Sequence, residues 1–204
     1  VQQALSSAGF EVQFALQEQQ LGTAHAISCA QPLLEKQADQ VLVTCADMPL
    51  LQEETLQRLV TLHAQSGGVM TMTSVIGEVP RGFGRVIRDE HGGVSAIVEE
   101  AVATPEQLAI REYNVSAYCF EAAWLWENLA RIQLSAKREY FLTDLVEIAV
   151  KQGYKVETLV VPDPTEALGI NTRVDLAAAE HAMRQRINQR WMLAGVTLLD
   201  PATT

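Results

Sequence analysis

The chain alternates between apolar runs of strand length and segments of helical periodicity, and this alternation constrains its fold more than any other feature. The strand-like runs are Gln40 to Cys45, Val69 to Val75, Val94 to Val98, Tyr113 to Phe120 and Lys155 to Val161. The helical patterns are Ala24 to Glu35, Glu53 to Gln65, Glu121 to Arg131, Thr143 to Lys151 and Arg173 to Ala194. Alternating strands and helices favour right-handed crossovers and a mainly parallel sheet. The strand-rich middle predicts an antiparallel ribbon inserted beside that sheet, so we expect an α/β fold.

Composition limits the size and partners of this fold. The chain has 204 residues, 48% of them hydrophobic, which is enough for one domain or a large part of one. Its net charge of -10 argues against binding to nucleic acid or to an anionic membrane surface, because both need clustered Lys and Arg. Cys29, Cys45 and Cys119 form no zinc or disulfide pattern, and there is no membrane-spanning or signal segment. We expect a cytoplasmic protein.

Asp47 follows the apolar run Val41 to Val43, where Met48 and Pro49 end the strand. In an open α/β sheet, ligands bind at the carboxyl ends of strands, so an Asp at this point is well placed to hold Mg²⁺. The alternative is a structural Asp that caps the helix beginning near Glu53 or closes a turn before Pro49. The segment by itself does not favour either role. Cys45, two residues earlier, is expected to pack and not to act as a nucleophile.

Asn171, in the segment Gly169 to Arg173, is a candidate partner for Asp47. Its amide oxygen is a neutral ligand that suits Mg²⁺, which takes few protein oxygens and adds phosphates and waters. The alternative is that Asn171 caps the long helix that follows, and both roles are compatible at a helix N-terminus.

The segment from Gln17 to Thr23 predicts a strand end, a polar turn and a helix start. Gly22 would let the backbone approach a ligand, and Thr23 is a natural N-cap for the helix that follows. His25, on a face of small residues, is expected to pack within that helix and not to bind a ligand.

Six short signatures stand in one order along the chain. They are LQEQQLGT (16–23), VTCADMPL (43–50), GFGRV (82–86), IVEE (97–100), EYFLTD (139–144) and GINTR (169–173). In this order they resemble sugar-nucleotide pyrophosphorylases, and specifically the uridyltransferase half of the bifunctional bacterial enzymes that make UDP-N-acetylglucosamine. The resemblance covers nearly the whole chain. It implies a Rossmann-like nucleotidyltransferase fold and an enzyme of cell-wall precursor synthesis.

The resemblance also implies roles for individual residues. Asp47 and Asn171 would be the catalytic residues that hold Mg²⁺, and the uracil base would be bound by Gln17, Gly22 and Thr23. The sugar would contact the Gly84 backbone and the Glu99 carboxylate, with Asn114 on the acetamido group and Thr143 on the sugar phosphate. Without the resemblance, the segment around Gly84 is a glycine-flexed hairpin entry and Glu99 an exposed charge. Arg85 and Arg173 are expected to form structural or surface ion pairs.

One departure from the family pattern lies at the predicted metal site. The family has Tyr-Gly-Asp where this chain has Cys45-Ala46-Asp47. An alanine is small enough to keep the backbone close to a ligand. The cysteine removes a ring and a hydroxyl that would contact the sugar.

The implied reaction is nucleotidyl transfer between UTP and N-acetylglucosamine 1-phosphate. A sugar phosphate oxygen attacks the α-phosphorus of UTP in line and pyrophosphate leaves, with Mg²⁺ bridging phosphates. The glycine-rich loop of the family has no counterpart in residues 1–204, and Val1 is not a native start. We therefore expect a truncated uridyltransferase domain (1–193) with little activity by itself.

The far end of the chain resembles the junction at which the family's uridyltransferase domain meets the next domain. Residues 191–202 match this junction, so residues 194–204 would begin a linker to an absent left-handed β-helix domain. The full-length parent is expected to be a homotrimer.

Two alternatives to this function remain open. The first is a nucleotidyltransferase of the same fold that uses another base or sugar, which Cys45 favours. The second is a non-catalytic remnant that binds nucleotide sugars or only partner proteins, which the missing glycine-rich loop favours.

Overall fold

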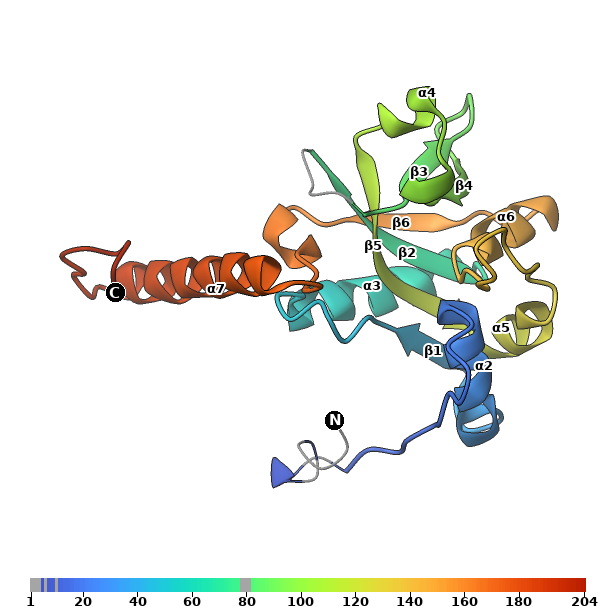
Figure 1. Cartoon of the computed structure of the whole chain (residues 1–204), viewed down its shortest axis with the longest axis horizontal. Coiled ribbons are helices and arrows are strands. Elements are labelled where there is room, and N and C mark those ends of the chain that lie inside the picture. Colours follow the sequence, from blue (N-terminus) through green and yellow to red (C-terminus); the bar gives the residue numbers. More distant parts are fainter. Residues whose placement is uncertain (1–4, 6, 10, 78–81) are drawn as a thin grey trace.

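The computed structural model describes residues 5, 7–9, 11–77 and 82–204, and six strands of this part form one mixed sheet (Figure 1). Val1, on which the expected loss of the N-terminus partly depends, lies outside the described residues. The strand order is β4-β3-β5-β2-β6, and β1 pairs with β5 beside this path. The strands are β1 (Gln40–Val43), β2 (Met70–Ile76), β3 (Arg85–Arg88), β4 (Val94–Val98), β5 (Glu112–Glu121) and β6 (Glu157–Val160).

The directions of the strands confirm an α/β fold and refine the expected sheet. Strands β1, β2, β3 and β6 run one way, whereas β4 and β5 run the other way. The long strand β5 leaves the ribbon formed by β3 and β4 and continues into the main sheet between β1 and β2. Only β2 and β6 are therefore hydrogen-bonded in parallel among the described strands. Antiparallel pairing extends further into the main sheet than the sequence pattern predicts.

Helices cover both faces of β5 because its side chains alternate. Tyr118 and Phe120 lie in the largest apolar cluster, with residues of α2 (Thr23–Leu34), α5 (Ala122–Leu129) and α6 (Asp144–Lys151). Ala117 and Cys119 point the other way and pack against α3 (Glu53–Ser66). The remaining helical elements are η1 (Glu100–Val102), α4 (Pro105–Leu108), η2 (Pro164–Ala167) and α7 (Arg173–Leu193), and α7 extends away from the body of the fold (Figure 1).

The pairing of β2 with β5 contains a pronounced β-bulge. Met72 is opposite Tyr118 and Ser74 is opposite Asn114, so three residues of β5 face a single residue of β2. That residue, Thr73, satisfies the bulge with its side chain, since its hydroxyl donates to Ala117 O at 3.0 Å and accepts from Ala117 N at 3.3 Å. Bulges of this kind bend a strand and re-aim its side chains.

A buried carboxylate joins the loop after β1 to the loop after β6. Glu166, in η2, is only 1% exposed, and its two oxygens accept hydrogen bonds from Gln52 N and Gln52 Nε2, both at 2.9 Å. Ile170 N donates to Asp47 O at 2.8 Å between the same two loops. Arg186 of α7 adds a bond to Leu50 O at 3.0 Å. The loop after β1 and the loop after β6 are thus held together although they lie far apart in sequence.

The expected elements agree with the structure to within a few residues at their ends, with four additions, two of which are the short turns η1 and η2. Strand β3 occupies the segment interpreted as a hairpin entry, and α4 is a single turn that the periodicity does not indicate. Helix α7 ends at Leu193, while the interpretation of residues 194–204 as a linker stays a prediction. Within the described residues, none of the helices combines the length and apolar character that crossing a membrane requires.

Glu166→Ala is predicted to destabilise the fold because both Gln52 donors would lose their buried acceptor. We expect a loss of about 1.5–3 kcal/mol in the free energy of unfolding, measured by urea denaturation. Glu166→Gln, which keeps one acceptor, should lose less. Glu90→Ala, at an exposed hairpin tip, is the matched control and should change stability by less than about 0.5 kcal/mol. Equal stabilities of the Glu166 and Glu90 alanine variants would contradict the structural role of Glu166.

Candidate functional site

A cleft of about 380 Å³ opens where the loops after β1 and β6 meet the ribbon. Its volume lies in the range typical of small-molecule sites. Five of the predicted site residues line it, namely Asp47, Gly84, Glu99, Asn114 and Asn171. The other lining residues are Cys45, Met48, Gly82, Phe83, Ser116, Leu168, Gly169, Asp175 and Ala178. The structure thus gathers predicted metal ligands and predicted sugar contacts in one hollow.

The side chains of Asp47 and Asn171 make no hydrogen bond to the described part of the chain. A Cβ added to Gly169 would lie 3.9 Å from Asp47 Oδ2, which shows how closely the two loops approach. Asp47 lies in a turn closed by a backbone bond from Met48 N to Cys45 O, and no described residue hydrogen-bonds its carboxylate. Asn171 is exposed, and its side chain likewise has no hydrogen bond to the described part of the chain.

The capping alternatives for these two residues are wrong. The N-cap of α3 is Gln52, not Asp47. The N-cap of α7 is Thr172, whose hydroxyl accepts from Asp175 N at 3.2 Å while the Asp175 carboxylate accepts from Thr172 N at 2.7 Å. A reciprocal capping box of this kind already satisfies the start of α7. Helix capping therefore explains neither Asp47 nor Asn171.

The donor set at this edge fits a hard cation held partly by substrate. Asp47 offers a carboxylate and Asn171 an amide oxygen, and no group of three or more His, Cys, Asp or Glu among the described residues forms a metal cage of its own. Mg²⁺ is commonly bound in this way, through one or two protein oxygens with phosphates and waters completing its shell.

Glu99 lines the cleft, whereas Thr143 lies outside the lining residues and contacts Glu99 from behind. The Thr143 hydroxyl donates to Glu99 Oε1 at 2.9 Å. Burial raises the pKa of the Glu99 carboxyl, while the bond from Thr143 and the charge of Lys137 oppose that rise. A Cβ on Gly84 would lie 3.6 Å from both Glu99 oxygens and would collide with Ile97 at 2.7 Å, so only glycine fits here. A partly desolvated carboxylate beside bare backbone is suited to hydrogen-bond hydroxyl groups.

Asn114 and Ser116 reach the cleft through the bulge in β5. Asn114 Nδ2 donates to the Tyr118 hydroxyl at 2.6 Å, and Asn114 Oδ1 accepts from Ser116 N at 3.1 Å. Asn114 thus holds the bulge in place while one face of its amide borders the cleft. Ser116 has a positive φ of 57°, a backbone conformation that residues other than glycine rarely adopt.

Ser116 and Cys45 meet in the cleft. Both side chains line it, and burial together with the Asp47 charge raises the pKa of the Cys45 thiol, while Ser116 opposes that rise. The raised pKa agrees with a packing role for Cys45. The sequence did not identify Ser116 as a site residue. Its position depends on the bulge, and a bulge depends on cross-strand register, which no local sequence pattern indicates.

Gln17, Gly22 and Thr23 lie outside the residues that line the cleft. Gly22 approaches backbone closely, as expected, but the backbone is that of Tyr140, whose oxygen would lie 2.6 Å from an added Cβ. Thr23 is not the N-cap of α2, since Gly22 holds that position. The Thr23 hydroxyl instead accepts from Leu142 N at 3.0 Å. Their binding of uracil stays a prediction.

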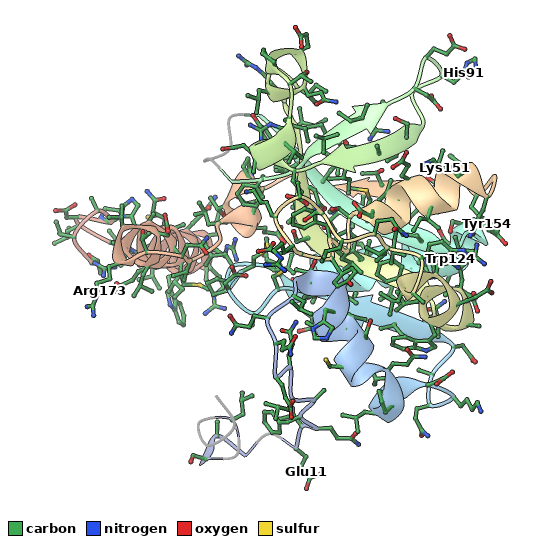
Figure 2. The ribbon with its side chains drawn as sticks, turned by 45° about the vertical axis from the view of Figure 1, so that its right-hand side comes forward. Glu11, His91, Trp124, Lys151, Tyr154 and Arg173 are labelled. Carbon is green, nitrogen blue, oxygen red and sulfur yellow. The ribbon has the colours of Figure 1, made fainter. Side chains whose placement is uncertain are left out.

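The two arginines singled out from the sequence have different surroundings. Arg85 is buried, pairs with Glu100 at 3.0 Å and stacks 4.8 Å from the centre of the Tyr113 ring. Its expected structural ion pair is confirmed. Arg173 is exposed at the start of α7, and its side chain extends outward from the ribbon (Figure 2).

The variants Asn171→Ala and Thr172→Ala are predicted to differ in stability. Thr172→Ala removes the cap of α7 and should cost about 1 kcal/mol. Asn171→Ala removes a side chain with no partner among the described residues and should change stability by less than about 0.5 kcal/mol. Thermal unfolding of the two variants, side by side, tests this difference. A larger loss in Asn171→Ala than in Thr172→Ala would show that Asn171 supports the fold.

Ser116→Gly is predicted to stabilise the protein because glycine adopts a positive φ without steric cost. We expect a gain of up to about 1 kcal/mol, reduced by the greater entropy of glycine in the unfolded chain. Ser116→Ala keeps the unfavourable φ and should show no gain. Urea unfolding of both variants measures the difference, and a Ser116→Gly protein less stable than Ser116→Ala would contradict it.

Comparison with known proteins agrees with this geometry. A family model described as nucleotidyl transferase matches residues 2–165. The chain is 46% identical over 194 residues to the bifunctional protein GlmU of Trichlorobacter lovleyi, covering 95% of this chain and 42% of that protein. It is 42% identical over 197 residues to GlmU of Exiguobacterium sibiricum, covering 96% and 44%. The chain thus spans less than half the length of these relatives.

Solved structures support the fold. One is the synthetase for CMP-2-keto-3-deoxy-manno-octonic acid complexed with CTP, with a TM-score of 0.66 and 16% identity over 91% of this chain and 77% of that one. Another is UDP-glucose pyrophosphorylase complexed with UDP-glucose, with a TM-score of 0.66 and 14% identity over 91% and 72%. The expected nucleotidyltransferase fold is confirmed. By the family match and by its fold, this chain belongs to the nucleotidyl transferase family.

Proposed function

We propose that this chain is the uridyltransferase part of a GlmU-type enzyme, which makes UDP-N-acetylglucosamine from UTP and N-acetylglucosamine 1-phosphate. The observation that carries the proposal is that Asp47, Asn171, Glu99, Gly84 and Asn114 line one cleft. These are the residues to which the family resemblance gives metal and sugar roles. The GlmU relatives align over 92% or more of the chain, which includes every one of these positions.

In this proposal the cleft accelerates the reaction by positioning the reactants and neutralising charge. Asp47 and Asn171 would hold Mg²⁺, which when bound offsets the negative charge of the phosphates. Glu99 accepts hydrogen bonds from sugar hydroxyls, and Thr143 keeps the carboxylate oriented through its 2.9 Å bond. Holding the sugar by its hydroxyls aims the phosphate oxygen at the α-phosphorus of UTP for in-line attack. No covalent enzyme intermediate is needed.

A second candidate is a nucleotidyltransferase of the same fold with another sugar. Cys45 favours it, because a thiol stands in the lining of the cleft where the family pattern has a tyrosine ring. A panel of sugar 1-phosphates separates the two candidates. N-acetylglucosamine 1-phosphate giving the highest kcat/KM supports the proposed function, and a different preferred sugar supports the alternative.

The wider setting of the enzyme is proposed on the same basis. We propose a cytoplasmic enzyme with small-molecule substrates and with Mg²⁺ as its metal, and a homotrimeric full-length parent. The low activity expected of residues 1–204 alone stays a prediction. Activity is therefore best measured in a protein that carries these residues together with a glycine-rich segment of the GlmU type.

Asp47→Asn is predicted to weaken Mg²⁺ use in that protein because it removes the charged ligand. Pyrophosphate release should fall by at least about tenfold, and the Mg²⁺ concentration for half-maximal rate should rise. Asn171→Ala should shift both quantities the same way but less, since it removes a neutral ligand. Glu90→Gln, far from the cleft on the ribbon tip, is the control and should behave like the unmodified protein. An unchanged Mg²⁺ titration in both cleft variants would remove the metal assignment.

A further inference from the structure

The side chain of Gln17 is held by two contacts that fix which way its amide faces. One amide atom lies 3.1 Å from Gly22 O. A carbonyl oxygen only accepts hydrogen bonds, so the Gln17 atom next to it is the nitrogen, Nε2. The Gly22 carbonyl therefore fixes the orientation of the amide, and Oε1 does not face it.

The second contact of Gln17 is with His25, in the first turn of α2. Gln17 Nε2 lies 3.0 Å from His25 Nδ1. Because Nε2 can only donate, Nδ1 must accept, and the imidazole carries its proton on the other nitrogen. His25 Nε2 lies 3.9 Å from Cys29 Sγ, a sulfur that can accept that proton. The contacts on both ring nitrogens are therefore satisfied by the same neutral tautomer.

These contacts use both hydrogens of the Gln17 amide. One hydrogen goes to Gly22 O and the other to His25 Nδ1. No described residue donates to Gln17 Oε1, and the side chain is only half-buried. Gln17 can thus offer a ligand an acceptor and no donor, although a glutamine amide in general offers both.

The segment that carries Gln17 belongs to the same framework as the cleft. Tyr140 N donates to Leu21 O at 2.7 Å, and Ala24 N donates to Tyr140 O at 3.1 Å. Thr143, three residues further on, bonds to Glu99 in the cleft wall. Gln17 is thus connected to Glu99 through the segment from Tyr140 to Thr143.

We infer that His25 is a positioning residue that makes Gln17 an acceptor-only group and thereby selects uracil over cytosine. The inference rests on the proposed function and on the predicted contact of Gln17 with the uracil base. At ring position 3 uracil presents an N–H donor, whereas cytosine presents a bare nitrogen that repels an oxygen. To donate to cytosine the Gln17 amide must flip, which breaks two hydrogen bonds when His25 is present and only the bond to Gly22 O when it is absent, so the distinction would weaken without His25.

Nucleotide binding to variants of His25 tests this role. The affinities for UTP and CTP, each with Mg²⁺, are measured by ligand-observed NMR, which detects weak binding to residues 1–204. His25→Leu removes the acceptor and should lower the UTP-to-CTP preference about tenfold, the effect of one hydrogen bond. His25→Asn restores an acceptor near the Nδ1 position and should keep the preference within about threefold. Cys29 contacts only the other ring nitrogen, so Cys29→Ala is the matched control and should leave the UTP-to-CTP preference unchanged.

The outcomes separate this inference from the proposed function. A preference for UTP that is unchanged in His25→Leu would overturn the role of His25 and leave the uridyltransferase proposal intact. Equal binding of UTP and CTP by the unmodified chain would instead contradict the proposed function, and with it this inference. A further measurement needs no variant. The ¹⁵N spectrum of the His25 imidazole at pH 8 should show the proton on Nε2, and a proton on Nδ1 would overturn the inference.

Discussion

The buried contact between Glu166 and Gln52 is the constraint on which the candidate site depends. The two residues are 114 positions apart, and a carboxylate that is almost completely buried must have its oxygens satisfied. Gln52 satisfies both, and this fixes the start of α3 against η2. The loops that carry Asp47 and Asn171 lie beside this contact and are joined by the bond from Ile170 N to Asp47 O. The edge that carries the two predicted ligands is therefore held by buried and backbone contacts, and the side chains of Asp47 and Asn171 take no part in them.

The other side of the cleft contains features that oppose stability. Ser116 adopts a positive φ, and burial raises the pKa of Glu99 because its charged form loses hydration. The fold compensates through Thr73, Asn114 and Thr143, which hydrogen-bond the bulge and the carboxylate. A residue with an unfavourable backbone conformation and a partly desolvated carboxylate in the same cleft are typical of a binding site. In this protein both occur at the cleft, on the side to which the proposed function assigns the sugar.

Structural and functional roles overlap in the segment from Gln17 to Thr23. The resemblance assigns these residues to the base, yet Gly22 and Thr23 also join α2 to the loop at Tyr140 and Leu142. Gln17 is held by Gly22 and His25. A substitution here would alter both the framework and the ligand contacts. Binding preferences between related ligands are therefore more informative at these positions than activity alone.

The sequence by itself determined the α/β class, the places of the main helices and strands, and the family, because these follow from local periodicity and from short motifs. It also identified Asp47, Asn171, Gly84, Glu99 and Asn114, which the structure gathers in one cleft. It did not decide whether Asp47 and Asn171 cap helices, since a cap depends on which side chain reaches the free N–H groups. The structure decided this, with Gln52 and Thr172 at those positions.

Only the tertiary structure revealed the course of β5, the bulge at Ser116 and the amide orientation of Gln17. Strand direction and register depend on which strands pair, and the partners of β5 lie up to about 80 residues away in β1. The orientation of an amide depends on which neighbours accept its hydrogens, and His25 becomes such a neighbour only when the segment folds back onto α2. Contacts between distant or folded-back residues leave no periodic signal in a single sequence, which is why these features required the structure.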